Sequence, residues 1–194
     1  MSDEVDDTED VLRRFVDALE AAGVPYMLTG SFASGYYGHG RGTQDVDFVI
    51  MPTREQLRAL VASFPDPRFY VDEQTAFEAL QGRGQFNVID RENAYKADFI
   101  IQKEALFNEE EFNRRIRATV YRVPLAIATA EDVILSKLEW ARLGSSLRQI
   151  EDAAGILEVR SAGLDRSYIE RWVERLGLQE QWTAALRSAA LPPE

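Results

Sequence analysis

Residues 29–50 read TGSFASGYYGHGRGTQDVDFVI, and this stretch decides the fold that we expect. Its last six residues, with apolar side chains at positions 46, 48 and 50, predict a β-strand over 45–50. A period of two places Asp45 and Asp47 on one face of this strand and Val46, Phe48 and Ile50 on the other. Two rises of about 3.3 Å separate the two aspartates by roughly 6.6 Å along the strand.

Two carboxylates on one strand face can bind the same cluster of cations. Magnesium takes oxygen ligands at about 2.0–2.1 Å. Without a cation, neighbouring carboxylates repel each other and one of them tends to hold a proton. Asp45 and Asp47 therefore indicate a divalent metal site, and the alternative is a solvated strand face that is merely acidic.

The second feature of the stretch is Gly30-Ser31, where a strand over 25–29 should end and a short helix over 32–37 should begin. Such a junction offers unpaired backbone N–H groups and the positive end of a helix to phosphate oxygens. Gly30 would let a phosphate approach the backbone, and the Ser31 hydroxyl would add a donor. A Gly-Ser pair alone is usually a turn, but its combination with Asp-x-Asp after thirteen residues is much more specific.

The quoted stretch resembles the signature of the DNA polymerase beta-like nucleotidyltransferase superfamily, in the small bacterial branch that includes AbiEii-type toxins. The resemblance covers roughly residues 11–125. It implies that Ser31 contacts the triphosphate and that Asp45 and Asp47 bind two Mg²⁺ ions, with Mn²⁺ as a substitute. It also implies a third aspartate on a later strand. Asp98 in Ala-Asp-Phe-Ile-Ile fits that setting better than Asp90, which stands at the entry to a turn.

Three more residues are candidates for nucleotide binding. Arg41 lies in a glycine-flanked loop and could fold onto the triphosphate, or it is a solvated loop arginine. Thr43 shares the strand parity of the two aspartates, so its hydroxyl could face the same site. Lys137 and the leucine after it match a Lys-Leu pair that faces the nucleotide in related enzymes, and the alternative is a surface lysine. The single histidine, His39, is interpreted as a loop residue.

The rest of the chain predicts an α/β (α+β) fold in which helices flank a mixed sheet. Residues 1–10 contain six acids and no base, and predict a disordered acidic leader. Residues 11–127 alternate helical and extended patterns and predict the nucleotidyltransferase core, whereas 128–194 predict a C-terminal helical appendage. The core helices are expected over 11–22, 54–63, 74–80 and 109–115, and the further strands over 68–71, 85–89, 95–101 and 119–123.

Composition excludes several classes of protein. The chain is 45% hydrophobic and 28% charged, which is ordinary for a soluble globular protein, and it has no cysteine for disulfides or thiolate metal sites. Its apolar runs are far shorter than the roughly 20 residues of a membrane span, so we expect a cytoplasmic protein. The net charge is −11, and the basic run over 114–117 is explained by a helix C-terminus. An overall basic footprint for nucleic acid is therefore missing.

The resemblance implies metal-dependent transfer of a nucleotide from an NTP, such as ATP, to a hydroxyl-bearing acceptor. A tRNA end, a protein side chain and a small molecule such as an aminoglycoside all remain open as acceptors. The AbiEii-like branch suggests a toxin with a cognate antitoxin. The alternative is a non-catalytic nucleotidyltransferase-like antitoxin or nucleotide-sensing protein, which should have lost a carboxylate or the Gly-Ser pair.

Overall fold

The computed structural model describes residues 2–190 and divides into two compact units. The first unit comprises the chain up to Leu28 together with Thr43–Ile127, and the second comprises Thr29–Gly42 together with the chain from Ala128 onward. The expected core over 11–127 differs from the first unit, because residues 29–42 belong with the helices. The reason is that the helix within this segment packs against two helices of the C-terminal part.

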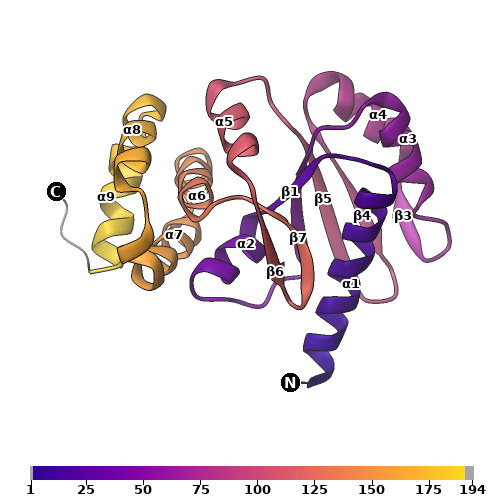
Figure 1. The fold of residues 1–194 in the computed structure, drawn as a ribbon, viewed down its shortest axis with the longest axis horizontal. Helices are drawn as coiled ribbons and strands as arrows, with labels where there is room; N and C mark the ends of the chain where they lie inside the picture. Colours follow the sequence, from indigo (N-terminus) through magenta and orange to yellow (C-terminus); the bar gives the residue numbers. More distant parts are fainter. Residues whose placement is uncertain (1, 191–194) are drawn as a thin grey trace. The chain divides into compact units, whose positions relative to one another are not determined.

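The first unit is built on a mixed β-sheet (Figure 1). Within the described residues it has seven strands in the order β3-β4-β5-β2-β1-β7-β6. Strand β2 runs parallel to β5, and β1 runs parallel to β7, whereas β4 is antiparallel to both β3 and β5. The strands are β1 (Tyr26–Thr29), β2 (Asp45–Ile50), β3 (Phe69–Val71), β4 (Gln85–Asp90), β5 (Tyr95–Ile101), β6 (Ile116–Val120) and β7 (Val123–Ile127).

One face of the sheet carries an aromatic core. Phe99 on β5 stacks on Phe48 of β2 and Phe86 of β4, with ring centroids 5.7 Å and 5.2 Å apart. Phe15 adds an edge-on contact to Phe99 at 6.3 Å and so attaches its helix to this face. The period of two that predicted these strands therefore sends their apolar side chains to one side of the sheet.

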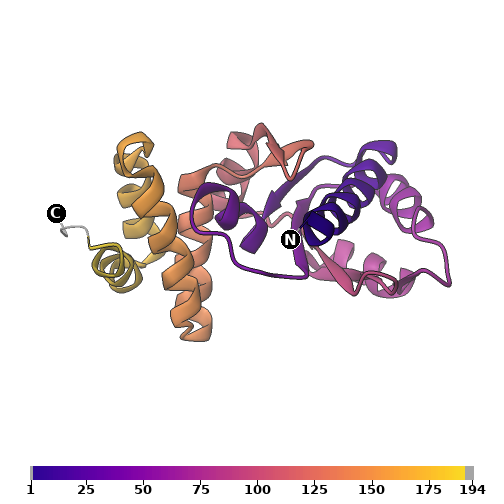
Figure 2. The same cartoon turned by 90° about the horizontal axis from the view of Figure 1, so that it is seen from below.

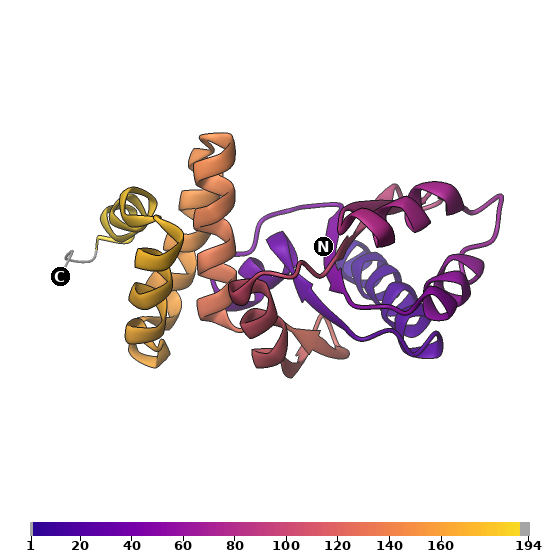
Figure 3. The ribbon, with the colours of Figure 1, turned by 90° about the horizontal axis from the view of Figure 1, so that it is seen from above.

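Helices α1 (Ser2–Ala21), α3 (Arg54–Ala62), α4 (Glu73–Gly82) and α5 (Leu106–Arg114) complete the first unit. Helix α3 packs beside α4 (Figure 3). Thr53 caps α3 through a reciprocal capping box with Gln56, as the sequence indicates. Within the described residues no helix is long and apolar enough to cross a membrane.

Helix α1 includes most of the segment that was expected to be a disordered leader. Met1 lies outside the described residues. Thr8 bonds the Tyr95 hydroxyl at 2.7 Å, and Glu9 accepts from Arg13 at 2.8 Å and also pairs with Arg122. These contacts hold Thr8 and Glu9 in place, and the helix predicted over 11–22 therefore starts earlier, within the acidic segment.

The strand expected over 119–123 is instead a hairpin of β6 and β7. The turn between them uses Tyr121 and Arg122, whose φ angles are 44° and 61°. Two consecutive positive φ angles are typical of a two-residue hairpin turn, which Asn-Gly or Asp-Gly usually forms. Tyr-Arg carries no such signal, so the sequence predicts a continuous strand through this turn.

The second unit is helical. Helix α2 packs against α6 and α7, α8 packs against α6, and α9 packs against α7 (Figures 1 and 2). Thr129 caps α6 by accepting from the backbone N–H of Asp132, whose carboxylate accepts from the Tyr168 hydroxyl at 2.5 Å. The helices are α2 (Gly30–Tyr37), α6 (Ala130–Gly144), α7 (Leu147–Arg160), α8 (Arg166–Leu176) and α9 (Gln179–Ser188), with a 3₁₀ turn over Ser161–Gly163.

Candidate functional site

The three predicted carboxylates lie on one face of the sheet in the first unit. Strands β2 and β5 are parallel neighbours, with Asp45 opposite Lys96 and Asp47 opposite Asp98. Residues that are opposite each other on paired strands project from the same face. The other face is the buried aromatic core. The alternation within two strands and their register thus gather Asp45, Asp47 and Asp98 on the polar face.

Lys96 lies among these carboxylates and was not among the predicted site residues. Its Nζ is 3.0 Å from Asp98 Oδ2 and 3.3 Å from Asp45 Oδ1. The hydrogen bond to Asp98 raises the pKa of Lys96, and the charges of Asp98 and Asp45 act in the same direction. The signal was available, because Lys96 precedes Asp98 by two residues on a strand and must share its face.

The carboxylates suit a divalent cation by chemistry and by backbone placement. Carboxylate oxygens are ligands of Mg²⁺, and neighbouring strands are about 4.8 Å apart. Among the residues that the structure describes, however, no three His, Cys, Asp or Glu side chains are already gathered tightly enough to hold a metal ion. Asp45 and Asp98 are instead turned toward Lys96. Binding a cation here therefore requires these two side chains to leave the lysine.

Asp90, the alternative third carboxylate, has a structural position. It lies opposite Tyr95 on the buried side of the sheet and is 1% exposed. Its Oδ2 accepts from Arg68 at 3.0 Å and from Arg14 at 3.3 Å. Of the two alternatives, only Asp98 shares a face with Asp45 and Asp47.

Thr43 has a local partner at the start of β2. Its Oγ1 accepts a hydrogen bond from the backbone N–H of Asp45 at 3.2 Å. The hydroxyl thus satisfies a donor at the strand entry, and the predicted contact of Thr43 with a nucleotide stays a prediction.

A second cluster, in the helical unit, contains three of the predicted nucleotide-binding residues. The Arg41 guanidinium donates to Ser31 Oγ at 2.6 Å and to Asp152 Oδ1 at 3.2 Å. Lys137 donates to Asp152 Oδ2 at 2.7 Å, and the Lys137 and Asp152 side chains are only 5% and 7% exposed. We call Ser31, Arg41, Lys137 and Asp152 the basic cluster.

Asp152 was not among the predicted site residues. A spacing of four residues from Arg148 is typical of an ion pair along one helix, but the structure pairs Asp152 with Lys137 and Arg41. Two cations thus share one buried carboxylate, which leaves the cluster with an excess of positive charge. That excess suits an anion such as a phosphate group.

The N-terminus of α2 adds to the basic cluster. Gly30, the first residue of α2, has a φ of 63°, which glycine adopts without strain. Thr29 precedes it and makes no side-chain cap, so the first N–H groups of α2 lack a capping side chain. Uncapped N–H groups at a helix N-terminus are suited to binding an anion.

Two glycines hold the Arg41 loop against α7 within the same unit. A Cβ on Gly38 would lie 2.6 Å from the carbonyl carbon of Gly155, so the two backbones are in direct contact. The next residue, His39, bonds Glu158 at 2.8 Å in an exposed pair. His39 thus helps to fasten the loop, in agreement with its interpretation as a loop residue.

Comparison with known proteins yields structural similarity only. No family model matches the chain, and no curated protein matches it. An antigenic nucleotidyltransferase-like protein from Paracoccidioides brasiliensis superposes with a TM-score of 0.58 at 14% identity, over 94% of this chain and 93% of that one. The antibiotic-resistance factor ANT(2'')-Ia superposes with a TM-score of 0.55 at 13% identity, over 91% and 94%. The structure of ANT(2'')-Ia in complex with adenylyl-2''-tobramycin superposes with a TM-score of 0.50 at 14% identity, over 94% of this chain and 97% of that one.

These likenesses extend over nearly the whole length of both chains, so this chain has the nucleotidyltransferase fold that the sequence predicted. At such low identity they establish the fold and leave the activity to the site. The AbiEii-like branch stays a prediction.

Proposed function

We propose that this protein is a metal-dependent nucleotidyltransferase that transfers a nucleotide from an NTP to a hydroxyl-bearing acceptor. One observation carries the proposal. The register of β2 and β5 places Asp45, Asp47 and Asp98 on one polar face, in a chain with the fold of nucleotidyltransferases. The non-catalytic alternative is less well supported, because such a protein should have lost one of these carboxylates or Gly30-Ser31.

The basic cluster would bind the triphosphate. Arg41 and Lys137 would exchange their contacts with Asp152 for phosphate oxygens, and Ser31 would donate its hydroxyl once Arg41 turns away. Asp152 keeps both cations paired until then and so holds them in a compact arrangement. The uncapped N–H groups of α2 would add donors without any rearrangement of side chains.

The polar face would hold the cations of the reaction. Asp45, Asp47 and Asp98 are the expected ligands of two Mg²⁺ ions, with Mn²⁺ as a substitute, and these ions would neutralise phosphate charge and lower the pKa of the acceptor hydroxyl. Asp98 would accept the proton of that hydroxyl. The hydroxyl oxygen then bonds to the α-phosphorus as the bond to pyrophosphate breaks. Lys96 would release its carboxylates when the ions bind.

The acceptor class rests on weaker support. One structural neighbour was solved with adenylyl-2''-tobramycin, so a small hydroxyl-bearing molecule such as an aminoglycoside is one candidate. A tRNA end or a protein side chain is the other, and either would suit a cytoplasmic toxin with a cognate antitoxin. These assignments rest on resemblance alone.

The test is incubation of the purified protein with each labelled NTP, Mg²⁺ and separate pools of tRNA, protein and aminoglycosides. We expect label transfer that disappears in Asp45→Ala and in Asp47→Ala. Asp66→Ala serves as a matched control, because Asp66 is an acid of the same unit with an 81% exposed side chain. Transfer that persists in both variants would refute the metal roles. NTP binding without any transfer would support the non-catalytic alternative instead.

A further inference from the structure

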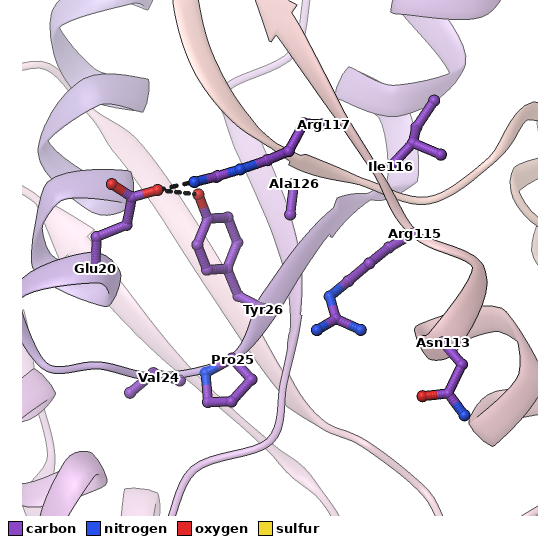
Figure 4. A pocket seen from close by; sticks show the side chains of 9 residues that line it. All are labelled: Glu20, Val24, Pro25, Tyr26, Asn113, Arg115, Ile116, Arg117 and Ala126. Atoms are coloured by element: carbon purple, nitrogen blue, oxygen red, sulfur yellow. Dashed lines mark hydrogen bonds and ion pairs between the residues drawn. The ribbon is translucent and has the colours of Figure 1, made fainter.

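A second candidate binding site lies in the first unit, in a pocket of about 530 Å³ between α5, β6 and the start of β1 (Figure 4). Asn113, at the end of α5, and Arg115, the residue after α5, project into it. Val24, Pro25 and the ring of Tyr26 form the wall on the side of β1. The pocket thus combines an apolar wall with the polar side chains of Asn113, Arg115, Arg117 and Glu20.

This pocket is separate from the polar face that carries the carboxylates. The backbone N–H of Met51, directly after β2, donates to the carbonyl of Pro25, directly before β1, at 2.9 Å. The start of β1 therefore lies beside the end of β2, whereas Asp45 is at the beginning of β2. Five residue rises of about 3.3 Å place these two ends roughly 16 Å apart. Whatever binds in the pocket does not occupy the carboxylate face.

Arg115 is the central residue of the pocket. Its guanidinium lies over the Phe112 ring at 4.2 Å and donates one hydrogen bond to the Phe112 carbonyl at the end of α5. A guanidinium has five N–H donors, so most of them remain available. Among the side chains that the structure describes, residues 7–190, no carboxylate forms an ion pair with Arg115, and burial lowers the pKa of Arg115.

An arginine that is partly desolvated and has no counter-ion is unfavourable unless an anion reaches it. Arg117 differs, because Glu20 accepts from Arg117 at 3.0 Å and from the Tyr26 hydroxyl at 3.0 Å (Figure 4). Glu20 thus fixes the Tyr26 side of the pocket and neutralises Arg117. The positive charge that faces the pocket without a partner is that of Arg115.

We propose that this pocket binds a phosphate group, either as inorganic phosphate or as part of a small phosphate ester. Arg115 supplies a planar set of donors that matches a tetrahedral oxyanion, and the Asn113 amide adds another. The apolar wall accommodates the organic part of an ester. This assignment is independent of the nucleotidyl transfer proposed above.

The surroundings favour a small anion over a nucleic acid. The chain has a net charge of −11, and Glu109 and Glu110 precede the pocket residues on α5. Nucleic-acid binding relies on many cations that follow the phosphate backbone. Its affinity falls as the salt concentration rises, and it falls more steeply when more phosphates are contacted. The pocket instead concentrates its donors on one point.

The experiment is a titration of the whole protein with inorganic phosphate, followed by NMR of the arginine side-chain Nε–Hε signals. Substitution assigns these signals, because the Arg115 signal disappears in Arg115→Gln. We expect the Arg115 signal to shift and saturate with phosphate while the Arg83 signal does not. Arg83 is a matched control, since it also follows a helix of this unit and donates to a backbone carbonyl.

Calorimetry with variants completes the test. Arg115→Gln should weaken phosphate binding at this site at least tenfold, and Arg115→Lys should retain part of it, with unchanged thermal unfolding in both. Tighter binding of phenyl phosphate than of phosphate would identify an ester as the occupant, and equal binding would identify free phosphate. An Arg115 signal that never saturates would overturn the proposal. A single-stranded oligonucleotide that binds Arg115 more tightly than phosphate would overturn it in favour of a nucleic-acid contact.

Discussion

Neutralising Asp152 should destabilise the helical unit much more than neutralising an exposed acid on the same helix. Asp152→Asn removes the charge that two cations share, and leaves the Lys137 ammonium buried beside Arg41. Removal of one partner from a buried ion pair costs about 3–5 kcal/mol. Arg41 keeps a third of its side chain in solvent and can be hydrated, so we expect about 3 kcal/mol.

Urea unfolding monitored by tryptophan fluorescence measures this change selectively. The chain has three tryptophans, and Trp140, Trp172 and Trp182 all belong to the helical unit. Glu158→Gln is the matched control, because its pair with His39 is exposed and should change the free energy of unfolding by less than about 0.5 kcal/mol.

A double-mutant cycle decides whether the lost stability comes from the ion pair. Asp152→Asn combined with Lys137→Met removes both buried charges, and we expect most of the stability to return, to within about 1 kcal/mol of the wild type. The reasoning is wrong if Asp152→Asn costs no more than Glu158→Gln. It is also wrong if the double variant is as unstable as Asp152→Asn alone.

Three further predictions concern other parts of the chain. Gly38→Ala should destabilise the helical unit by about 2 kcal/mol in the same urea assay, because its Cβ would lie 2.6 Å from the backbone of Gly155. Burial and then the charge of a nearby glutamate raise the pKa of Tyr26 to about 12, so stability should fall between pH 10 and 12 as the unfolded chain ionises first, and Tyr26→Phe should reduce this loss. Asp98→Asn should abolish nucleotide transfer with little change in stability, whereas Asp90→Asn should lower the free energy of unfolding by about 3 kcal/mol.

Each of these predictions has its own control. A Cβ on Gly42 would meet no atom within 4 Å, so Gly42→Ala should leave stability unchanged, and equal effects at both glycines would contradict the packing argument. An alkaline stability profile that is the same in wild type and Tyr26→Phe would exclude the ionisation of Tyr26 as its cause. Full transfer activity in Asp98→Asn would remove this residue from the proposed chemistry.

The strands that position the carboxylates could be predicted because their pattern is local. The alternation around Asp45 and Asp47 fixes which side chains share a face, and the same rule applied to β5 places Asp98 and Lys96 together. The pairing of β2 with β5 joins segments about fifty residues apart, and no local pattern encodes it. The preference for Asp98 over Asp90 therefore rested on the residues around each aspartate in the sequence. The register explains why only Asp98 shares the polar face, since it lies opposite Asp47.

Two features that the local pattern does not predict share a cause, which is contact between distant segments. Asp152 has a plausible helical partner four residues away, yet it pairs with Lys137 and Arg41 because α2, α6 and α7 pack together. Segment 29–42 looks like part of the core because it connects β1 to β2. Its assignment to the helical unit follows from the close contact of Gly38 with Gly155, which is visible only in three dimensions.

Both charged clusters are partly neutralised from within, without any ligand. Lys96 neutralises carboxylates of the polar face, and Asp152 pairs the cations of the basic cluster. In the proposed reaction a metal ion would displace Lys96 and a triphosphate would displace Asp152, so each ligand would break an existing ion pair for each contact that it makes. We therefore expect Mg²⁺ alone, and an NTP without Mg²⁺, each to bind only weakly to the protein.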